Sequence, residues 1–137
     1  MNEIRIEGGN PLTGEVRIQG SKNAALPMMA AALLHKGKSV LHHCPKIADV
    51  FVMEEILREL GMQIHHEGDT LTLDPAHVER TEIDCCEGQK MRSSVILLGS
   101  LLGRYHSASV PHPGGCVIGE RPIDLHLYAL ERLGAVF

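Results

Sequence analysis

Residues 22–61, KNAALPMMAAALLHKGKSVLHHCPKIADVFVMEEILRELG, carry the clearest secondary-structure signals of this chain. The first part of this stretch, residues 22–35, is rich in Ala and Leu, and this composition favours a helix. Pro27 is expected near the first turn of that helix, where the N–H group that proline lacks has no intrahelical partner in any case. A strand is expected next, at residues 38–43 (KSVLHH).

A second helix is expected from Asp49 to Leu60, with Asp49 as its N-cap and Gly61 as its stop. Its apolar residues recur on one helical face, as expected for a helix packed on a core: Val50, Met53, Leu57 and Leu60. Residues 62–67 and 70–74 flank a Gly68-Asp69 turn, and this arrangement predicts a β-hairpin.

Elements of the same kinds are expected on either side of this stretch. Before it, residues 3–7 and 15–20 alternate apolar and polar side chains around the turn PLTG, which predicts two short strands. After it, the sequence predicts a helix at 90–103, a strand at 106–110, a helix at 123–133 ending at Gly134, and the start of a strand at 135–137.

The second half of the chain repeats the order of the first. Leu33-Leu34 corresponds to Leu101-Leu102, and the set Leu57, Leu60 and Gly61 corresponds to Leu130, Leu133 and Gly134. The sequence therefore predicts an α/β protein built from two copies of a β-α-β-α-β-β unit, at about 22–74 and 90–137. Because the second copy stops where its hairpin should begin, we expect the chain to be cut inside a repeat.

Composition excludes several classes of protein. The formal net charge of −4 over 137 residues argues against a nucleic-acid-binding protein, which needs a basic face. No apolar run is long enough to span a membrane, and the N-terminus does not resemble a signal peptide. The four cysteines, without C-x-x-C spacing, are interpreted as reduced thiols of a cytoplasmic protein.

Neither a metal nor a cofactor is expected. The nine histidines suggest a metal at first sight. However, His42-His43 and His65-His66 fall on predicted strands, where neighbouring side chains point to opposite faces. No spacing fits a set of zinc ligands.

The strongest functional motif is HPGGCVIGERPIDLH, residues 112–126. The paired glycines before Cys116 allow a ligand to approach the backbone closely, and Arg121 would favour the reactive thiolate of Cys116. The alternative is a Gly-rich turn with a passive cysteine. Asp124 and His126 open the following helix, where they are either ligand-binding groups or ordinary solvated residues.

Basic residues recur where strands lead into helices. Ser21-Lys22-Asn23 precedes the first helix, where free N–H groups and the helix field attract anions. The alternative is a helix cap beside a solvated lysine. Lys90 and Arg92 stand at the matching junction in the second copy. Together with Lys22 and Arg121 they make four cations near such junctions, and this group could bind an anionic small molecule.

Three motifs together resemble the UDP-N-acetylglucosamine 1-carboxyvinyltransferase family of enolpyruvyl transferases. They are GSKNAALP at 20–27, KMRSS at 90–94 and PGGCVIGERPIDLH at 113–126. The resemblance runs along the whole chain but covers only the first third of a family chain. It implies an inside-out α/β fold of repeated units, with helices inside and sheets facing solvent. It also implies that residues 1–21 pack on the family's second domain, while residues 22–137 form an incomplete first domain.

The resemblance implies transfer of the enolpyruvyl group of phosphoenolpyruvate to the 3-hydroxyl of UDP-N-acetylglucosamine, by addition and then elimination of phosphate. Cys116 would be the loop cysteine that acts as the acid toward the enolpyruvyl methylene carbon, and the target of fosfomycin. The general base would lie beyond residue 137. The implied substrate-binding residues are Lys22, Asn23, Arg92, Arg121, Pro122, Ile123, Asp124, Leu125 and His126.

Three alternatives stay open. A 5-enolpyruvylshikimate-3-phosphate synthase has the same fold and donor, but it lacks the Gly-Gly-Cys loop that holds Cys116. A non-catalytic relative could bind a nucleotide sugar, although the set of Lys22, Arg92, Cys116 and Arg121 argues against it. The chain could also be a structural fragment without a ligand of its own.

Overall fold

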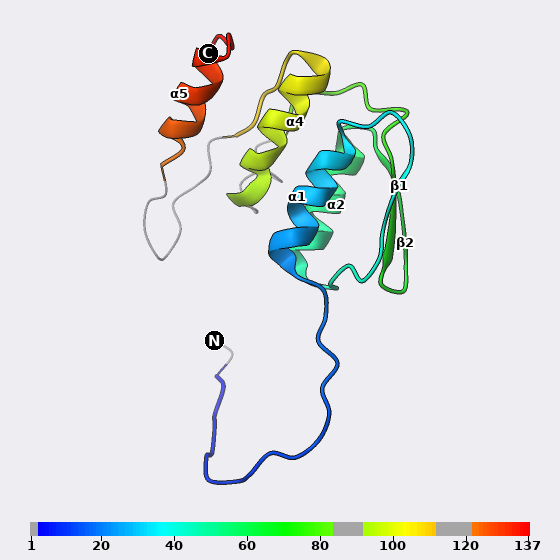
Figure 1. Ribbon diagram of the computed structural model, residues 1–137, viewed down its shortest axis with the longest axis vertical. Helices are drawn as coiled ribbons and strands as arrows, with labels where there is room; N and C mark the ends of the chain where they lie inside the picture. The colour runs from blue at the N-terminus through cyan, green and yellow to red at the C-terminus, as the bar shows by residue number, and fades with distance from the viewer. Residues whose placement is uncertain (1–2, 84–91, 112–121) are drawn as a thin grey trace.

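The computed structural model describes residues 3–83, 92–111 and 122–137. The helices and strands follow in this order: α1 (Lys22–Ala32), β1 (Ser39–Leu41), α2 (Ala48–Glu59), β2 (Gln63–Glu67), β3 (Thr70–Asp74), the 3₁₀ helix η1 (Arg92–Val95), α4 (Ile96–Tyr105) and α5 (Asp124–Arg132). Helices α1 and α2 cover one face of a small sheet, and α4 packs against α1 on the side away from the sheet (Figure 1).

Helix α1 is formed by the Ala- and Leu-rich stretch, as predicted, but it ends at Ala32 rather than at residue 35. Its buried residues recur every three or four positions and face the core: Ala25, Leu26, Met29, Ala30 and Ala32. Pro27 lies in the helix interior, so its expected place near the first turn was wrong. Since Pro27 has no N–H, the Asn23 carbonyl lacks its usual donor four residues on.

Helix α2 presents the predicted apolar face, and Val50, Met53 and Leu57 are fully buried. The predicted cap was wrong, because the N-cap is Ile47 and makes no side-chain capping bond. Asp49 lies instead in the first turn, where its charge is favourably placed in the helix field. After the helix, Gly61 adopts a φ of 106°, the left-handed conformation that commonly ends helices.

The three strands form an antiparallel sheet in the order β1-β3-β2. The predicted hairpin is confirmed, with Glu67 opposite Thr70, while β1 is shorter than the predicted strand at 38–43. Leu71 and Leu73 of β3 are buried under the helices, and the alternate residues Thr70 and Thr72 are only partly covered. The sheet therefore has one face on the core and one toward solvent, as expected for helices inside and sheets outside.

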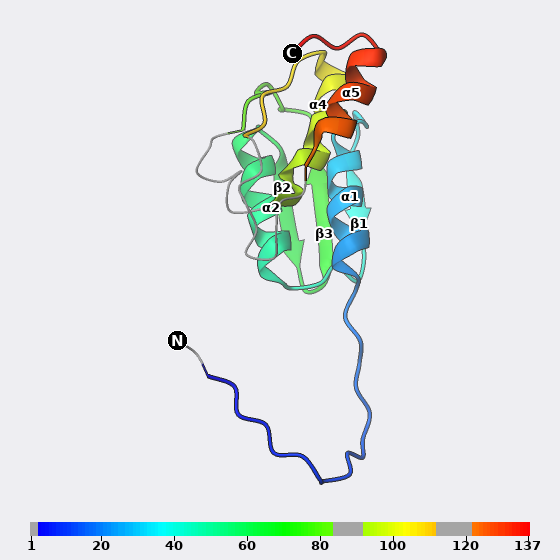
Figure 2. The ribbon, with the colours of Figure 1, turned by 90° about the vertical axis from the view of Figure 1, so that its left-hand side faces the viewer.

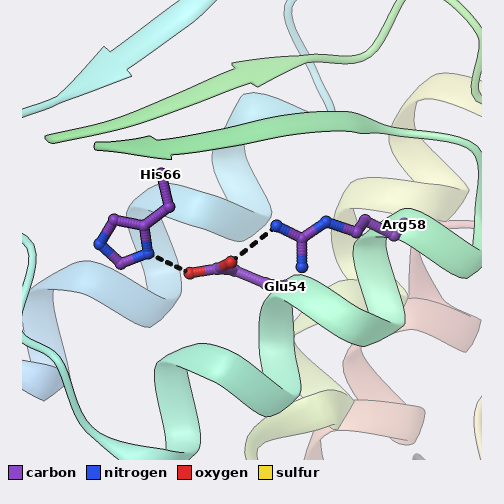
Figure 3. A network of polar contacts seen from close by, with 3 residues as sticks. All are labelled: Glu54, Arg58 and His66. Atoms are coloured by element: carbon purple, nitrogen blue, oxygen red, sulfur yellow. Dashed lines mark hydrogen bonds and ion pairs between the residues drawn. The ribbon is translucent and has the colours of Figure 1, made fainter. Parts of the chain in front are cut away.

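A polar cluster lies within this core, between α2 and β2 (Figure 3). The side chain of Glu54 is only 3% exposed and contacts Arg58 at 2.9 Å and His66 at 2.8 Å. His66 and His65 point to opposite faces of β2, as the strand periodicity predicted. His42 and His43 follow the end of β1, so their predicted place on a strand was wrong.

The second copy of the repeat is only partly formed. Helix α4 lies where the helix at 90–103 was predicted, and Leu101 is fully buried like its counterpart Leu33. The predicted strand at 106–110 is reduced to one parallel bridge, between Glu82 and Ser109. Arg104 joins the two copies, since its guanidinium donates hydrogen bonds to the carbonyls of Leu33 and His35 at the end of α1.

Helix α5 confirms the helix predicted at 123–133, but none of its residues is buried. In both views it lies level with the C-terminal half of α4, at the edge of the molecule (Figures 1 and 2). No strand forms at 135–137. The sequence pattern of α5 predicts a helix from neighbouring residues alone. Burial of its apolar side chains needs another element packed against it, and the described residues do not supply one.

The strands predicted at 3–7 and 15–20 are not formed. Residues 3–19 run as an exposed segment without secondary structure, leading away from the helices and sheet (Figure 2). Their apolar side chains are at least 83% exposed: Ile4, Ile6, Leu12, Val16 and Ile18. Alternation of apolar and polar residues makes a strand possible, but a strand also needs a neighbour for its backbone hydrogen bonds.

Candidate anion-binding site at the start of α1

The helices α1, α2 and α4 run in the same direction, so their N-terminal ends point to one side of the molecule (Figures 1 and 2). The N-terminal end of a helix carries a partial positive charge and N–H groups without intrahelical acceptors. This side of the molecule is therefore electrostatically suited to an anion. Lys22 begins α1, and Arg92 begins the 3₁₀ helix that leads into α4.

The chain enters α1 through Ser21, whose extended backbone sets the direction of the first turn. The carbonyl of Ser21 accepts hydrogen bonds from the N–H groups of Ala24 and Ala25, at 3.2 and 2.9 Å. The N–H groups of Lys22 and Asn23 precede these donors and have no acceptor within the helix. Ser21 makes no side-chain capping bond, so this end of α1 remains open to a ligand.

Lys22 is held by a residue of the neighbouring helix. Its Nζ lies 2.6 Å from Oδ2 of Asp49, in the first turn of α2, and the two side chains are 50% and 39% exposed. The pair thus joins the N-terminal ends of α1 and α2 while leaving the ammonium group accessible to solvent. Asp49 was predicted as a cap, and sequence spacing gave no sign of this contact.

Gly20 allows the chain to pass close to the loop that follows β1. A Cβ atom at Gly20 would lie only 1.8 Å from the carbonyl oxygen of His43. His43 itself has a φ of 57°, which is unusual for a residue other than glycine. The sequence motif therefore requires glycine before Ser21-Lys22 for a steric reason.

The loop that follows β1 is anchored to the hairpin turn. Nδ1 of His43 donates a hydrogen bond to Oδ2 of Asp69 at 3.0 Å, and the N–H of Cys44 donates to the Asp69 carbonyl at 2.7 Å. The hydrogen bond from His43 is the main cause that holds the pKa of the Asp69 carboxyl below its ordinary value. An open cavity of about 350 Å³ lies here, lined among others by Arg17, Gly20, His43, Lys46 and Asp69.

The structure brings together only part of the predicted site. Lys22 and Asn23 lie exposed at the start of α1, and Arg92 is placed at the start of η1. Cys116 and Arg121 lie outside the described residues, as do Cys85, Cys86 and Lys90. Cys44 is buried, and burial, followed by the negative charge of Glu54, raises the pKa of its thiol.

The remaining predicted residues, 122–126, lie on and before the first turn of α5. Pro122, Asp124, Leu125 and His126 are exposed, and Ile123 is half-buried. Figures 1 and 2 show α5 well away from the start of α1, so the structure does not place these residues beside Lys22.

Sequence reasoning missed three side-chain contacts of the described structure. The Glu54–Arg58 pair has the four-residue spacing of a helical ion pair and could have been found from the sequence. The contacts of Asp49 with Lys22 and of Glu54 with His66 join different elements, and no spacing rule predicts them. Across residues 3–83, 92–111 and 122–137, no three His, Cys, Asp or Glu side chains are grouped to hold a metal ion.

In the same described ranges, no helix has the length and apolar character needed to span a membrane.

The comparison with solved structures gives a fold-level match. The enolpyruvyl transferase NikO from Streptomyces tendae matches with a TM-score of 0.65 and 32% sequence identity, over 69% of this chain and 22% of that chain. The described helices and sheet therefore have the arrangement of part of an enolpyruvyl transferase.

Curated relatives match nearly the whole chain. UDP-N-acetylglucosamine 1-carboxyvinyltransferase 2 of Caldanaerobacter subterraneus is 44% identical over 98% of this chain, and UDP-N-acetylglucosamine 1-carboxyvinyltransferase of Methylacidiphilum infernorum is 47% identical over 98%. The chain spans 32% of the length of each. Residues 6–136 match the family described as EPSP synthase (3-phosphoshikimate 1-carboxyvinyltransferase), and the chain therefore belongs to this family of enolpyruvyl transferases.

Proposed function

We propose that this chain is the N-terminal part of an enzyme that transfers the enolpyruvyl group of phosphoenolpyruvate to the 3-hydroxyl of UDP-N-acetylglucosamine and releases phosphate. One observation carries the proposal. Relatives that bear the name of this activity are 43–47% identical to the chain over nearly all of its length. The same reaction would make the protein a cytoplasmic enzyme of peptidoglycan synthesis.

Lys22 and Asn23 would hold the donor at the start of α1. A phosphate group suits this position, because Lys22 supplies a positive charge and the first N–H groups of the helix supply hydrogen-bond donors. Arg92 would contribute a second cation from the start of η1. Cations here would also stabilise the charge that develops on the departing phosphate.

The residues after the Gly-rich loop would bind the acceptor. Arg121 and Pro122–Leu125 would line the UDP-sugar site, with His126 behind them. Figures 1 and 2 show α5 away from the start of α1, so this assignment requires α5 to approach that end of α1 in the complete protein. The absence of buried residues in α5 leaves its surface available for that approach.

The proposed chemistry is an addition followed by an elimination. The sugar 3-hydroxyl oxygen bonds to C2 of phosphoenolpyruvate, and C3 gains a proton from the Cys116 thiol. The resulting tetrahedral intermediate then returns a proton from C3 to the Cys116 thiolate and loses phosphate from C2, which restores the double bond. The general base that takes the hydroxyl proton would come from the rest of the chain.

The acceptor can be tested directly in the complete protein. Phosphate release from phosphoenolpyruvate should require UDP-N-acetylglucosamine, and shikimate 3-phosphate should not replace it. This comparison separates the proposed activity from that of the synthase after which the family is described. Turnover with shikimate 3-phosphate alone would overturn the proposal, and binding without turnover of either acceptor would favour a non-catalytic relative.

The rest of its own chain would be the main protein partner. Residues 1–21 would pack on a second domain, and residues 22–137 would form the beginning of the first. The exposed apolar side chains between Ile4 and Ile18 support this assignment, because such residues gain stability when they are covered. We expect no requirement for a metal or an organic cofactor.

A further inference from the structure

The ion pair between Lys22 and Asp49 joins two helices that carry the candidate anion site. Nζ of Lys22 and Oδ2 of Asp49 are 2.6 Å apart, within the range of a charge-assisted hydrogen bond. Each residue belongs to the first turn of its helix, and the two helices pack against each other. The contact therefore sets where the lysine ammonium lies relative to the open end of α1.

Stability alone does not account for this contact. Both side chains are more than a third exposed, and exposed ion pairs contribute little to the free energy of folding. A lysine side chain has four flexible carbon atoms and many rotamers, whose freedom is lost when a ligand fixes the ammonium group. A partner that already restrains Lys22 reduces that loss upon ligand binding.

We propose that Asp49 is a positioning residue for Lys22. Its carboxylate accepts a hydrogen bond from one of the three N–H groups of the Lys22 ammonium. The other two N–H groups are thereby directed toward the open N-terminal end of α1. This inference rests on the proposed function, in which Lys22 holds the phosphate of phosphoenolpyruvate. Asp49 itself would not touch the phosphate, because two anions in direct contact repel each other.

The opposite effect of Asp49 is also physically possible, and the two effects have opposite signs. The carboxylate could compete with phosphate for Lys22, so that its removal would tighten donor binding. We expect positioning to dominate, because Asp49 occupies one N–H group of the Lys22 ammonium and the Lys22 side chain remains 50% exposed. Removal of the Asp49 charge therefore weakens phosphoenolpyruvate binding if Asp49 positions Lys22, and tightens it if Asp49 competes with the phosphate.

Asp49→Asn in the complete protein provides the test, because asparagine keeps the shape of the side chain and removes its charge. We expect the KM for phosphoenolpyruvate to rise about tenfold. The KM for UDP-N-acetylglucosamine and the melting temperature should change little. Asp74→Asn is the control for loss of an ion-paired aspartate away from α1, since Asp74 lies on the sheet, 3.6 Å from Lys38, with its side chain 18% exposed.

A double-mutant cycle shows whether Asp49→Asn changes the KM for phosphoenolpyruvate through Lys22. If Asp49 acts through Lys22, Asp49→Asn should cause no further loss in a Lys22→Gln background. An undiminished loss in that background would overturn the proposal, as would a KM equal to that of the Asp74→Asn control or a lower KM for phosphoenolpyruvate.

The proposed function and this inference can fail separately. If the wild-type complete protein does not turn over phosphoenolpyruvate with UDP-N-acetylglucosamine, the proposed function fails. The same variants are then compared by calorimetric titration with inorganic phosphate. Binding that is weakened by Asp49→Asn, but not by Asp74→Asn, would retain the positioning role, whereas unchanged or absent binding would reject it.

Discussion

Gly20 is the residue whose small size most directly allows Lys22 to reach its place. The backbone at Gly20 passes so close to the His43 carbonyl that an added Cβ atom would lie 1.8 Å from its oxygen. Backbone atoms cannot move aside as a flexible side chain can. The requirement for glycine in the motif GSKN therefore follows from contact with a loop more than twenty residues away.

We predict that Gly20→Ala destabilises the complete protein by about 1–3 kcal/mol, because the two backbone segments must separate. It should also raise the KM for phosphoenolpyruvate, since Lys22 moves with the segment. Urea denaturation and steady-state kinetics would measure the two effects. Gly99→Ala is the control, because Gly99 is exposed on α4 and no atom lies within 4 Å of the position that its Cβ would take.

Cysteine reactivity is a second property of individual residues. Cys44 is buried, and its raised pKa keeps it as a thiol at neutral pH. We therefore predict that Cys116, flanked by glycines and near Arg121 in sequence, reacts first with limiting iodoacetamide in the complete protein. Mass spectrometry would locate the adduct. Preferential labelling of Cys44, Cys85 or Cys86 would contradict this.

Helix α2 and strand β2 are joined by one buried carboxylate. Glu54 contacts Arg58 within its own helix and His66 across the interface, and it is almost completely shielded from water (Figure 3). A buried carboxylate is tolerated only where hydrogen bonds and opposite charges compensate its lost hydration. This cluster therefore sets the alignment of the helix on the sheet as well as contributing to stability.

We predict that Glu54→Ala lowers the free energy of unfolding by about 1–3 kcal/mol, because His66 and Arg58 lose their common partner. Glu55→Ala, on the exposed side of the same helix, should change it by less than about 0.5 kcal/mol. Urea unfolding followed by circular dichroism would compare the two variants. Equal effects would show that the Glu54 contacts contribute nothing beyond helix propensity.

The described elements form two sets, one from α1 to β3 and one from η1 to α5. The first has a core of aliphatic side chains between two helices and a sheet. The second contributes α4 to that core, while α5 remains uncovered. Large exposed apolar side chains are concentrated in the segment before α1 and in and after α5, and such surfaces commonly mark interfaces.

We predict that the 137-residue chain alone releases no phosphate from phosphoenolpyruvate above background when UDP-N-acetylglucosamine is supplied. The chain spans about a third of the length of its relatives, so groups from the remainder, including the general base, would be missing. General acid–base catalysis alone typically contributes about 10²–10⁴-fold. A phosphate-release assay would test this, and clear turnover would show that the chain is self-sufficient.

Elements whose signals are local could be predicted from the amino-acid sequence. Apolar periodicity predicted α2, the Gly68-Asp69 turn predicted the hairpin, and the apolar stretch at 90–103 predicted α4. The motif Ser21-Lys22-Asn23 also predicted a basic helix start correctly. Its proposed ligand remains a prediction, as do the roles of Cys116 and Arg121. Helical and strand periods and turn chemistry act over a few residues, so they can be recognised without knowing the tertiary structure.

Which residues contact one another across elements depends on the folded arrangement of those elements. The same carboxylate chemistry makes Asp49 a partner of Lys22, and Glu54 a buried partner of His66. Conversely, the alternating segment before α1 forms no strand, because the described residues offer no neighbouring strand to receive its hydrogen bonds. These outcomes depend on contacts between elements distant in the chain, and local sequence patterns contain no information about such distances.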